Sequence, residues 1–548
     1  MRLTLRALVF VVALLGFSAS QAREASAIWS RDGILLAWPL VTAGPRLGSD
    51  GAGGVFVTWV PIGSGAVGYW NKRQVGALRI TSDGTSAPGW PDSGVVIGVA
   101  NQSGANSVES IDAVIPDGLG GAYVQYKPYI THTSWSCLAH VTTTGPDFNG
   151  WPRDFPLSPL VSIAVNDPGG LLCAYRSYNY YGWAMPISLQ RIRRDGSQAA
   201  IQQPLMTQAN VFPEIDTNHS GGALACRFCE VQGLDSSMTE VWSSGPWPGC
   251  TSNMALVSDG LHGAFLAWVS GSIMRVTRVD SLGHASPGWP TNGFDVGVAD
   301  VYSGNPLRLT GDGAGGFFLR WQIETAYLVQ RITGAGVVAP GWSPSGTVLG
   351  PPDYSTAPSE IVPDGEGGLY VAWQAAGTPQ TGGDIYAQRL TSAGVPAPGW
   401  LATGSPICTA PGYQTGVSVA PDGFGGVYLA WRDYRNGPNP QIYAQHLLKN
   451  ERSVIAAPDS PALALSIAVR ANPSRSSIQC YFTVPSTLSA RIDVFDTAGR
   501  RVYRRTIDEA PAGANRASLA LKDAPPGLYL VRLSQAGLNA TTRVVVIP

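Results

Sequence analysis

A five-residue phrase returns eight times along the chain and constrains the fold more than any other feature. Its regular form is an acidic or amide residue, Gly, any residue and Gly-Gly, as in Asp50–Gly54 and Asp422–Gly426, and the third, fourth and fifth copies depart from it at one or more positions. Its last glycine falls at residues 54, 121, 170, 222, 263, 316, 368 and 426, so the period is about 50 residues. A repeat of this size is typical of an array in which each unit buries its sheet against the next.

The residues around the phrase predict a unit of three or four short strands. In the seventh repeat the glycine-rich turn joins a strand at 360–363 to a strand at 369–373. Gly, Asn and Asp tolerate the positive φ that such a turn needs. Both faces of the second strand are apolar, which indicates a sheet covered on both sides. A third strand at 384–390 and a Pro-Gly-Trp element follow. Such units, repeated radially, are typical of β-propeller blades.

One aromatic position accompanies the repeat. Seven of the eight repeats place Trp or Tyr five residues after the last glycine, and Arg227 breaks the series in the fourth. Because this position repeats with the fold, we expect its rings to form the core between blades. They are Trp59, Tyr126, Tyr175, Trp268, Trp321, Trp373 and Trp431.

The two ends of the repeat array complement each other. The last repeat runs through 441–447 and stops without a Pro-Gly-Trp element, whereas 31–39 look like the missing half. An N-terminal strand that completes the last blade would leave no exposed sheet edge. We therefore predict an eight-bladed propeller over 28–450, or seven blades if the fourth repeat, in which Asn218 replaces Asp, forms none.

Composition agrees with an all-β fold. The chain has 548 residues, which leaves room for a large domain and a small one. Charged residues make up only 13%, hydrophobic residues 44%, and 66 Gly and 42 Pro are typical of turn-dense β structure. The net charge of −1 argues against nucleic acid or an anionic membrane surface as a partner.

The N-terminus reads as a secretory signal peptide. Arg2 and Arg6 precede an apolar stretch at 7–17, and small residues follow, so we predict a signal peptide over 1–22. The apolar stretch is too short to span a membrane, and no later segment is long enough, so we expect no transmembrane segment in the mature chain. The mature protein is expected to be secreted or displayed at the cell surface.

A different pattern follows the repeats. Residues 451–462 have the composition of a linker, and 463–548 read as the strands of a small sandwich. The phrases Asp496–Arg500 and Pro526–Tyr529 resemble those of the C-terminal sorting domains of type IX secretion and of the related immunoglobulin-like domain of flagellar hook-capping proteins. The resemblance covers about 85 residues. It implies an immunoglobulin-like sorting or anchoring domain that is recognised by outer-membrane secretion machinery.

The repeat has a resemblance of its own. Trp431–Gly437 and Asp384–Arg389 are similar to a repeat of exported bacterial proteins, Trp-x-Asp-x-Arg-x-Gly followed by Asp-Ile-Tyr-Ala-Gln-Arg. This resemblance implies a propeller fold and supplies no activity.

Two features invite a metal. The repeated Asp, at residues 50, 117, 259, 312, 364 and 422, could bind calcium, but each turn offers one carboxylate. We expect that carboxylate to accept backbone N–H groups of its own turn. Cys226, Cys229 and Cys250 form the one cysteine cluster among seven cysteines. In an exported chain we expect a disulfide from Cys250 to Cys226 or Cys229, rather than a zinc site with His219. We predict no cofactor and no metal, with calcium as the alternative.

A non-repeating aromatic segment is the candidate binding site. Tyr178, Tyr180, Tyr181 and Trp183 lie in a loop between two strands and could stack on sugar rings or on a protein partner. The alternative is that these rings only cover a blade edge.

The sequence predicts a secreted or cell-surface binding or structural protein. No nucleophile elbow, His-Glu-x-x-His motif or phosphate loop is present, so we predict no catalytic residues. The alternative is an extracellular glycan-active hydrolase or lyase with its site in the propeller channel. Such an enzyme needs two carboxylates at one place, and the sequence brings no two of Glu109, Glu214, Glu240 and Glu324 together.

Overall fold

The computed structural model divides into two compact units, Met1–Val454 and Ile455–Pro548. The predicted signal peptide (1–22) and linker (451–462) lie outside the described residues. Where the chain is described, no helix is long and apolar enough to cross a membrane. The described residues are 29–30, 32–37, 41–61, 74–99, 107–129, 136–155, 160–166, 170–178, 184–206, 214–227, 229–298, 307–323, 326–349, 361–376, 382–449, 465–470, 474, 477–484, 489–508, 513–521, 524–535 and 538–547.

The described strands of the first unit form eight antiparallel sheets, numbered here by repeat. The first sheet contains β2 (Val41–Ser49), β3 (Val55–Pro61), β4 (Gln74–Ile80) and β5 (Val95–Val99). The second contains β6 (Ser107–Pro116), β7 (Ala122–Tyr129), β8 (Ser136–Thr142), β9 (Gly145–Asp147) and β10 (Arg153–Phe155). The third contains β11 (Leu160–Asn166), β12 (Gly170–Tyr178), β13 (Ala184–Ile192) and β14 (Gln198–Met206). The fourth contains β15 (Ile215–Thr217), β16 (Ala223–Arg227), β17 (Glu230–Leu234) and β18 (Glu240–Ser243).

The remaining sheets repeat this order. The fifth contains β19 (Cys250–Ser258), β20 (Ala264–Ser270), β21 (Ile273–Val279) and β22 (Phe294–Val298). The sixth contains β23 (Arg308–Gly311), β24 (Phe317–Ile323), β25 (Ala326–Ile332) and β26 (Thr347–Val348). The seventh contains β27 (Val362–Pro363), β28 (Leu369–Ala376), β29 (Gly383–Leu390) and β30 (Ser405–Cys408). The eighth contains β31 (Gln414–Pro421), β32 (Val427–Asp433), β33 (Gln441–Leu447) and, from the other end of the array, β1 (Ile34–Ala37).

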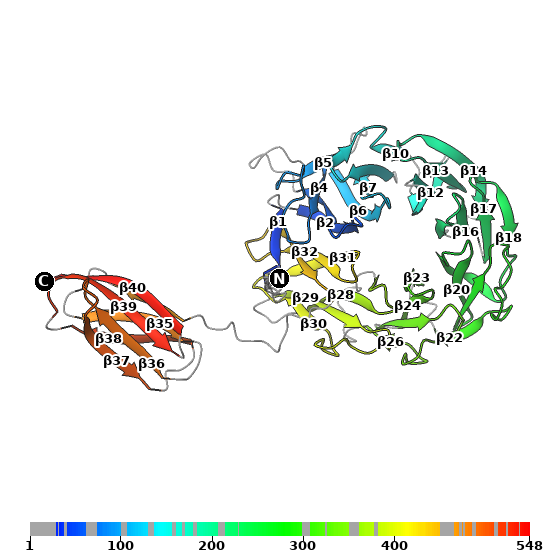
Figure 1. Cartoon of the computed structure of the whole chain (residues 1–548). Helices are drawn as coiled ribbons and strands as arrows, with labels where there is room; N and C mark the ends of the chain where they lie inside the picture. Colours follow the sequence, from blue (N-terminus) through cyan, green and yellow to red (C-terminus); the bar gives the residue numbers. More distant parts are fainter. Residues whose placement is uncertain are drawn as a thin grey trace, which may run out of the picture. The chain divides into compact units, whose positions relative to one another are not determined.

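Buried apolar clusters join each sheet to the next. One cluster joins the eighth, first and second sheets, and six others join the second sheet to the third and so on to the eighth. In Figure 1 the sheets follow one another round a ring, from blue through green to yellow, and β31 lies near β2. The all-β fold is confirmed, and the first unit is a β-propeller.

The N-terminus closes this ring, as the sequence predicts. β1 pairs antiparallel with β33, with Ile34 opposite Ala444. Trp29 supplies a second missing part, because its indole Nε1 donates to the carbonyl of Ser82 at 3.1 Å. The Pro-Gly-Trp tryptophan of the first repeat, Trp90, donates in the same way to Thr143 of the next repeat at 3.0 Å. Trp29 therefore takes the place of the tryptophan that the last repeat lacks.

The repeated aromatic position forms core, as predicted. Trp59, Trp268, Trp373 and Trp431 have 0% exposure, and Tyr126 and Trp321 are also buried. Tyr175 is half-buried and packs at the edge of the cluster between the second and third sheets. The third repeat is thus less tightly closed around its aromatic residue.

The second unit has two sheets around a separate core. The three-stranded sheet contains β34 (Ser466–Arg470), β35 (Ser477–Val484) and β38 (Gly513–Ala520). The four-stranded sheet has the order β37 (Arg501–Ile507), β36 (Ala490–Phe495), β39 (Gly527–Gln535) and β40 (Leu538–Val546). Strand β39 alternates buried Tyr529, Val531 and Leu533 with exposed Leu528 and Leu530, so one face covers the core and the other faces outward.

Candidate ligand-binding site

In the regular repeats the repeated Asp accepts hydrogen bonds within its own turn and pairs with a basic side chain of the same sheet. Asp50 Oδ1 accepts the amides of Ala52 at 2.7 Å and Gly54 at 2.8 Å, as predicted. Asp50 Oδ2 lies 2.8 Å from Nη2 of Arg79 on the third strand of the sheet. The same turn carboxylate meets Arg278, Arg331 and Arg389 in the fifth, sixth and seventh repeats, and His140 and His446 in the second and eighth.

Four of these residues, Arg278, Arg389, His140 and His446, also lie on a ring of the neighbouring strand. The guanidinium of Arg278 is 5.3 Å from the ring centroid of Phe265, and His446 stacks on Tyr428 with centroids 4.0 Å apart. Carboxylate, cation and ring form one packed stack. Both carboxylate oxygens already have partners, so the turns give no support to a calcium site, and calcium stays an untested alternative.

In the fourth repeat the carboxylate and its cation are lost together. Asn218 Oδ1 accepts the amides of Ser220 at 3.0 Å and Gly222 at 2.9 Å, so the turn keeps its shape. Gly233 stands opposite Leu224, where the other described sheets carry Arg or His. In the fourth repeat a neutral amide thus holds the turn without a carboxylate or a cation.

His140 is held between two carboxylates. Its Nε2 is 3.0 Å from Asp117 Oδ2 and its Nδ1 is 2.9 Å from Asp147 Oδ2. Ionised carboxylates only accept, so a ring nitrogen of His140 that carries a proton donates to the oxygen that it faces. Burial opposes ionisation of Asp117, but hydrogen bonds from His140 and from the amides of Leu119 and Gly121 outweigh it and lower the pKa.

The predicted aromatic site lies mostly beyond the described residues. Tyr180, Tyr181 and Trp183 fall outside them, and Tyr178 ends β12, where its backbone pairs with Ala184. Its side chain is not among the described parts. The aromatic binding site stays a prediction.

The cysteine cluster contains a disulfide. The structure joins Cys229 to Cys250, with Cα atoms 5.6 Å apart, and this is one of the two pairings that the sequence leaves open. Cys226 is a buried free thiol, and burial raises its pKa well above the usual value. Over the described residues, no group of three His, Cys, Asp or Glu is placed to hold a metal ion.

The third repeat departs from the others at the turn after its third strand. Arg193 and Arg194 stand there, directly after the last residue of β13. Six other repeats hold Thr or Asp followed by Ser, Thr or Gly, and the eighth has Leu448-Lys449. The six pairs are Thr81-Ser82, Thr142-Thr143, Asp235-Ser236, Asp280-Ser281, Thr333-Gly334 and Thr391-Ser392.

These two arginines line a cavity of about 780 Å³ between the third and fourth sheets. Arg191 lies beside them, and Ser236 and Ser237 of the β17–β18 turn form the opposite wall. We call this the arginine cleft. Arg191 Nη1 donates to the carbonyl of Ser236 at 3.0 Å, which ties the two walls together. A cavity of this size falls within the range of small-ligand pockets.

Two of the arginines, Arg193 and Arg194, make few contacts with the described residues. Arg193 donates through Nη1 to Ser197 Oγ at 3.2 Å and to the Gln198 carbonyl at 3.1 Å. Arg194 Nη2 is 3.5 Å from Asp117 Oδ2, an oxygen that His140 already engages. Within the described chain their remaining N–H groups contact no acceptor, so the cleft offers guanidinium donors to a ligand.

Sequence reasoning missed the cleft, although the signal was present. Aligning the repeats on the end of the third strand places Arg193 and Arg194 against small polar residues. The other repeats form this turn without arginine, so two arginines at this position are not required for the turn to fold. The opposing wall comes from the next repeat and becomes visible only when the sheets are packed.

The carboxylates proposed for a glycosidase do not meet in the described structure. Glu109 lies on β6 and Glu240 on β18, while Glu324 falls outside the described residues. Glu214 Oε1 is 2.8 Å from Nη1 of Arg308, which begins β23. That contact joins the fourth and sixth repeats by an ion pair rather than by a pair of carboxylates.

A family model identifies the tail. Residues 471–547 match the secretion system C-terminal sorting domain. Residues 471–547 are a type IX secretion sorting domain. The protein is therefore secreted or displayed at the cell surface, and its sorting domain interacts with the type IX machinery. No curated protein matches the chain.

Solved structures give weaker likenesses. PorZ, described as a bacterial surface component of the type-IX secretion system of Porphyromonas gingivalis, is 12% identical, covering 92% of this chain and 70% of PorZ with TM-score 0.34. A protein of unknown function from Dyadobacter fermentans is 12% identical. The match covers 61% of this chain and 93% of that protein, with a TM-score of 0.33. Prolyl oligopeptidase B from Galerina marginata is 13% identical. The match covers 73% of this chain and 56% of that protein, with a TM-score of 0.41. With TM-scores below 0.5, these likenesses support no inference about this chain.

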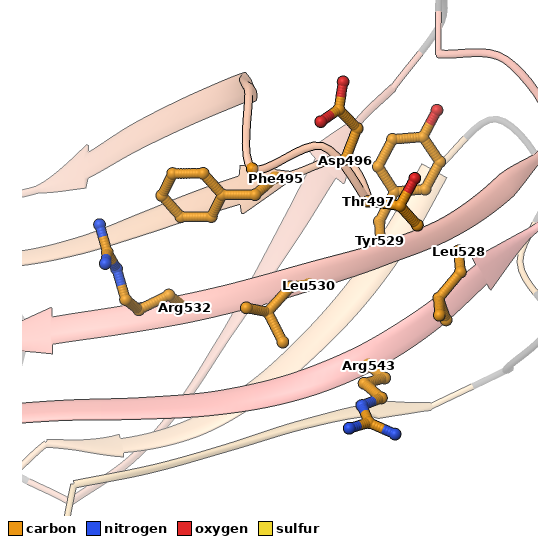
Figure 2. A pocket seen from close by; sticks show the side chains of 9 residues that line it. Phe495, Asp496, Thr497, Leu528, Tyr529, Leu530, Arg532 and Arg543 are labelled. Atoms are coloured by element: carbon orange, nitrogen blue, oxygen red, sulfur yellow. The ribbon is translucent and has the colours of Figure 1, made fainter.

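The sorting domain has a shallow cavity of about 430 Å³ on the outer face of its four-stranded sheet. Figure 2 shows Leu528, Leu530 and Arg532 along one strand, with Arg543 on the next strand and Phe495 nearby. Arg532 lies over the Phe495 ring at 4.6 Å from its centroid. The surface combines exposed aliphatic side chains with two guanidinium groups.

Proposed function

We propose that the protein is a cell-surface binding protein. In this proposal the sorting domain delivers the propeller, and the arginine cleft between the third and fourth sheets holds the ligand. The observation that carries the proposal is the placement of Arg193 and Arg194. They replace small turn residues of other repeats, line a cavity of about 780 Å³ and keep donors without a protein acceptor in the described chain.

The site also fits the usual division between scaffold and function. In the regular repeats the charged side chains close their own turns, which makes them part of the scaffold. Binding residues in repeat proteins are found where one unit departs from the pattern on a rigid frame. The third repeat departs in this way at Arg193 and Arg194, while its strands still pair as a four-stranded sheet.

A glycan array with the full mature chain tests the proposal. The cleft variant Arg193→Thr/Arg194→Ser restores the Thr-Ser turn of the first and seventh repeats, so its fold should be retained. Binding that the cleft variant loses supports the proposal. Binding that survives unchanged in the cleft variant contradicts it.

The same array separates the aromatic segment from the cleft. Tyr178→Ala and Trp183→Ala form a second pair of variants. If these abolish binding while the cleft variant retains it, the ligand site moves to the aromatic segment. Incubation of any bound glycan with the protein, followed by analysis of its chain length, tests the alternative of a hydrolase or lyase.

A further inference from the structure

We infer that the arginine cleft binds an anionic saccharide, that is, a sugar chain carrying carboxylate or sulfate groups. This inference rests on the proposed function and adds the class of ligand. It follows from three properties of the cleft: N–H groups of Arg193 and Arg194 that meet no acceptor among the described residues, a local excess of positive charge, and a lining without large apolar side chains.

Arg191 ties the two walls of the cleft together, whereas Arg193 and Arg194 do not close on the carboxylate of their own repeat's turn. Arg79, Arg278 and Arg331 each close on a turn carboxylate at 2.8 Å. Within the described residues, Arg193 instead donates to the neutral oxygens of Ser197 and Gln198, and after the Ser197 hydrogen bonds its charge adds to the lowering of the pKa of Asp195. A guanidinium without a carboxylate partner can present paired N–H groups to a planar carboxylate or to a sulfate.

The cleft is positive in a unit that is acidic overall. Met1–Val454 contains 25 basic and 31 acidic residues. The cleft nevertheless gathers three arginines around one carboxylate, that of Asp195. The Ser197 amide donates to Asp195 Oδ1 at 2.8 Å, and hydrogen bonds from Ser197 lower the pKa of Asp195. The carboxylate is thus held by its own turn, and the arginines remain in excess.

The side chains that line the cleft are charged, hydroxyl-bearing or small. The largest aliphatic side chain among them is that of Ala199, and the opposite wall consists of Ser236 and Ser237. The lining thus holds no aromatic or branched aliphatic side chain that could pack against an acyl chain or an aromatic ligand. Hydroxyl-bearing sugars with anionic substituents match both the serine wall and the arginine wall. The open cleft also admits a chain that continues beyond it.

The test is isothermal titration of the full mature chain with three defined oligosaccharides. A galacturonate hexamer carries only carboxylates, a sulfated dextran oligosaccharide carries only sulfates, and maltohexaose is neutral. Each is titrated at low and at physiological salt into the wild type, the cleft variant Arg193→Thr/Arg194→Ser and the control Arg501→Ser/Arg505→Ser. The control removes the same charge from β37 of the sorting domain.

We expect one or both acidic probes to bind, and the neutral probe not to bind. The cleft variant should weaken that binding at least about tenfold, because each lost guanidinium removes charge-assisted hydrogen bonds. The control should bind as the wild type does. Binding should weaken as salt rises, since the site is open to solvent. Comparing the galacturonate hexamer with the sulfated dextran oligosaccharide shows whether the cleft binds carboxylate or sulfate groups.

Three results would overturn the inference, and they separate it from the proposed function. Maltohexaose binding that depends on the cleft would refute the anionic ligand and leave the binding function in place. Acidic-probe binding that the control loses equally would indicate attraction to basic surface in general. Absence of binding by all probes, with the cleft variant and wild type giving the same glycan-array profile, would reject both. A thermal melt of each variant verifies that it is folded.

Discussion

The seventh repeat and the third repeat share a four-stranded sheet but differ in where their charges lie. In the seventh, Asp364 accepts two amides of its turn and pairs with Arg389 at 3.2 Å. In the third, Arg193 and Arg194 extend past the end of the strand into a cavity shared with the next repeat. The comparison teaches that a charge completing a turn belongs to the scaffold, whereas one without such a partner is available for binding.

The largest expected effect comes from the aromatic core of a regular repeat. Trp373→Ala should lower the free energy of unfolding by about 3–5 kcal/mol, because a fully buried indole leaves a large cavity. Tyr175→Ala in the third repeat should cost clearly less, since Tyr175 is half-buried. Urea unfolding of the two variants, followed by far-ultraviolet circular dichroism, compares their free energies of unfolding. Equal losses would show that the third repeat is packed as tightly as the seventh.

The disulfide between Cys229 and Cys250 should make the next largest contribution to the free energy of unfolding. Cys250→Ser opens a loop that spans 21 residues and should reduce stability by about 3 kcal/mol. Reducing the wild type with dithiothreitol should give a similar loss. Cys226→Ser serves as the control, because Cys226 is a free thiol in the structure. A loss in Cys226→Ser that matches Cys250→Ser under oxidising conditions would indicate the other pairing.

The carboxylate and cation of a regular turn should behave as one unit. Asp259→Asn leaves Arg278 without its partner and should cost about 1–3 kcal/mol, as should Arg278→Met. The double variant imitates the fourth repeat, where Asn218 meets no cation, and should cost less than the sum of the two. A double-mutant cycle from urea unfolding gives the coupling. Additive losses would mean that the pair does not stabilise the turn.

These comparisons also show what the sequence could predict. The repeat phrase located the turns, the strands and the role of the N-terminal segment, because these depend on local pattern and on closing a ring. The partner of Asp50 was not predictable, since Arg79 lies 29 positions away and meets it only through strand register. The arginine cleft was harder still, because Ser236 belongs to another sheet.

In the second and eighth repeats the turn carboxylate pairs with a histidine, so the stability of the protein in acid reports on that pair. His140 and His446 help to lower the pKa values of Asp117 and Asp422 against the effect of burial. A carboxyl whose folded pKa is depressed stabilises the fold above its unfolded pKa of about 3.9, and this stability is lost as pH falls through the folded value. His140→Gln should therefore raise the pH of acid unfolding.

Melting temperatures measured between about pH 2 and pH 6 test this prediction. The loss in His140→Gln near neutral pH should be about 1.5–3 kcal/mol, the range for hydrogen bonds to charged groups. His284→Gln is the control, because His284 lies in an exposed turn and bonds to Asp280 through its backbone amide and carbonyl. An acid transition that does not move in His140→Gln would contradict the role of the His140 ring in holding Asp117 ionised.

The smallest expected effect is the stability change in the arginine cleft, and it decides whether the comparison holds. Arg193 and Arg194 contact neutral oxygens of their own turn and one carboxylate that is already engaged. Their replacement by Thr and Ser should change the unfolding free energy by less than about 0.5 kcal/mol, as for most surface substitutions. Arg331→Ser in the sixth repeat should cost much more, since Arg331 pairs with a fully buried Asp312. A large loss in the cleft variant would place its arginines in the scaffold after all.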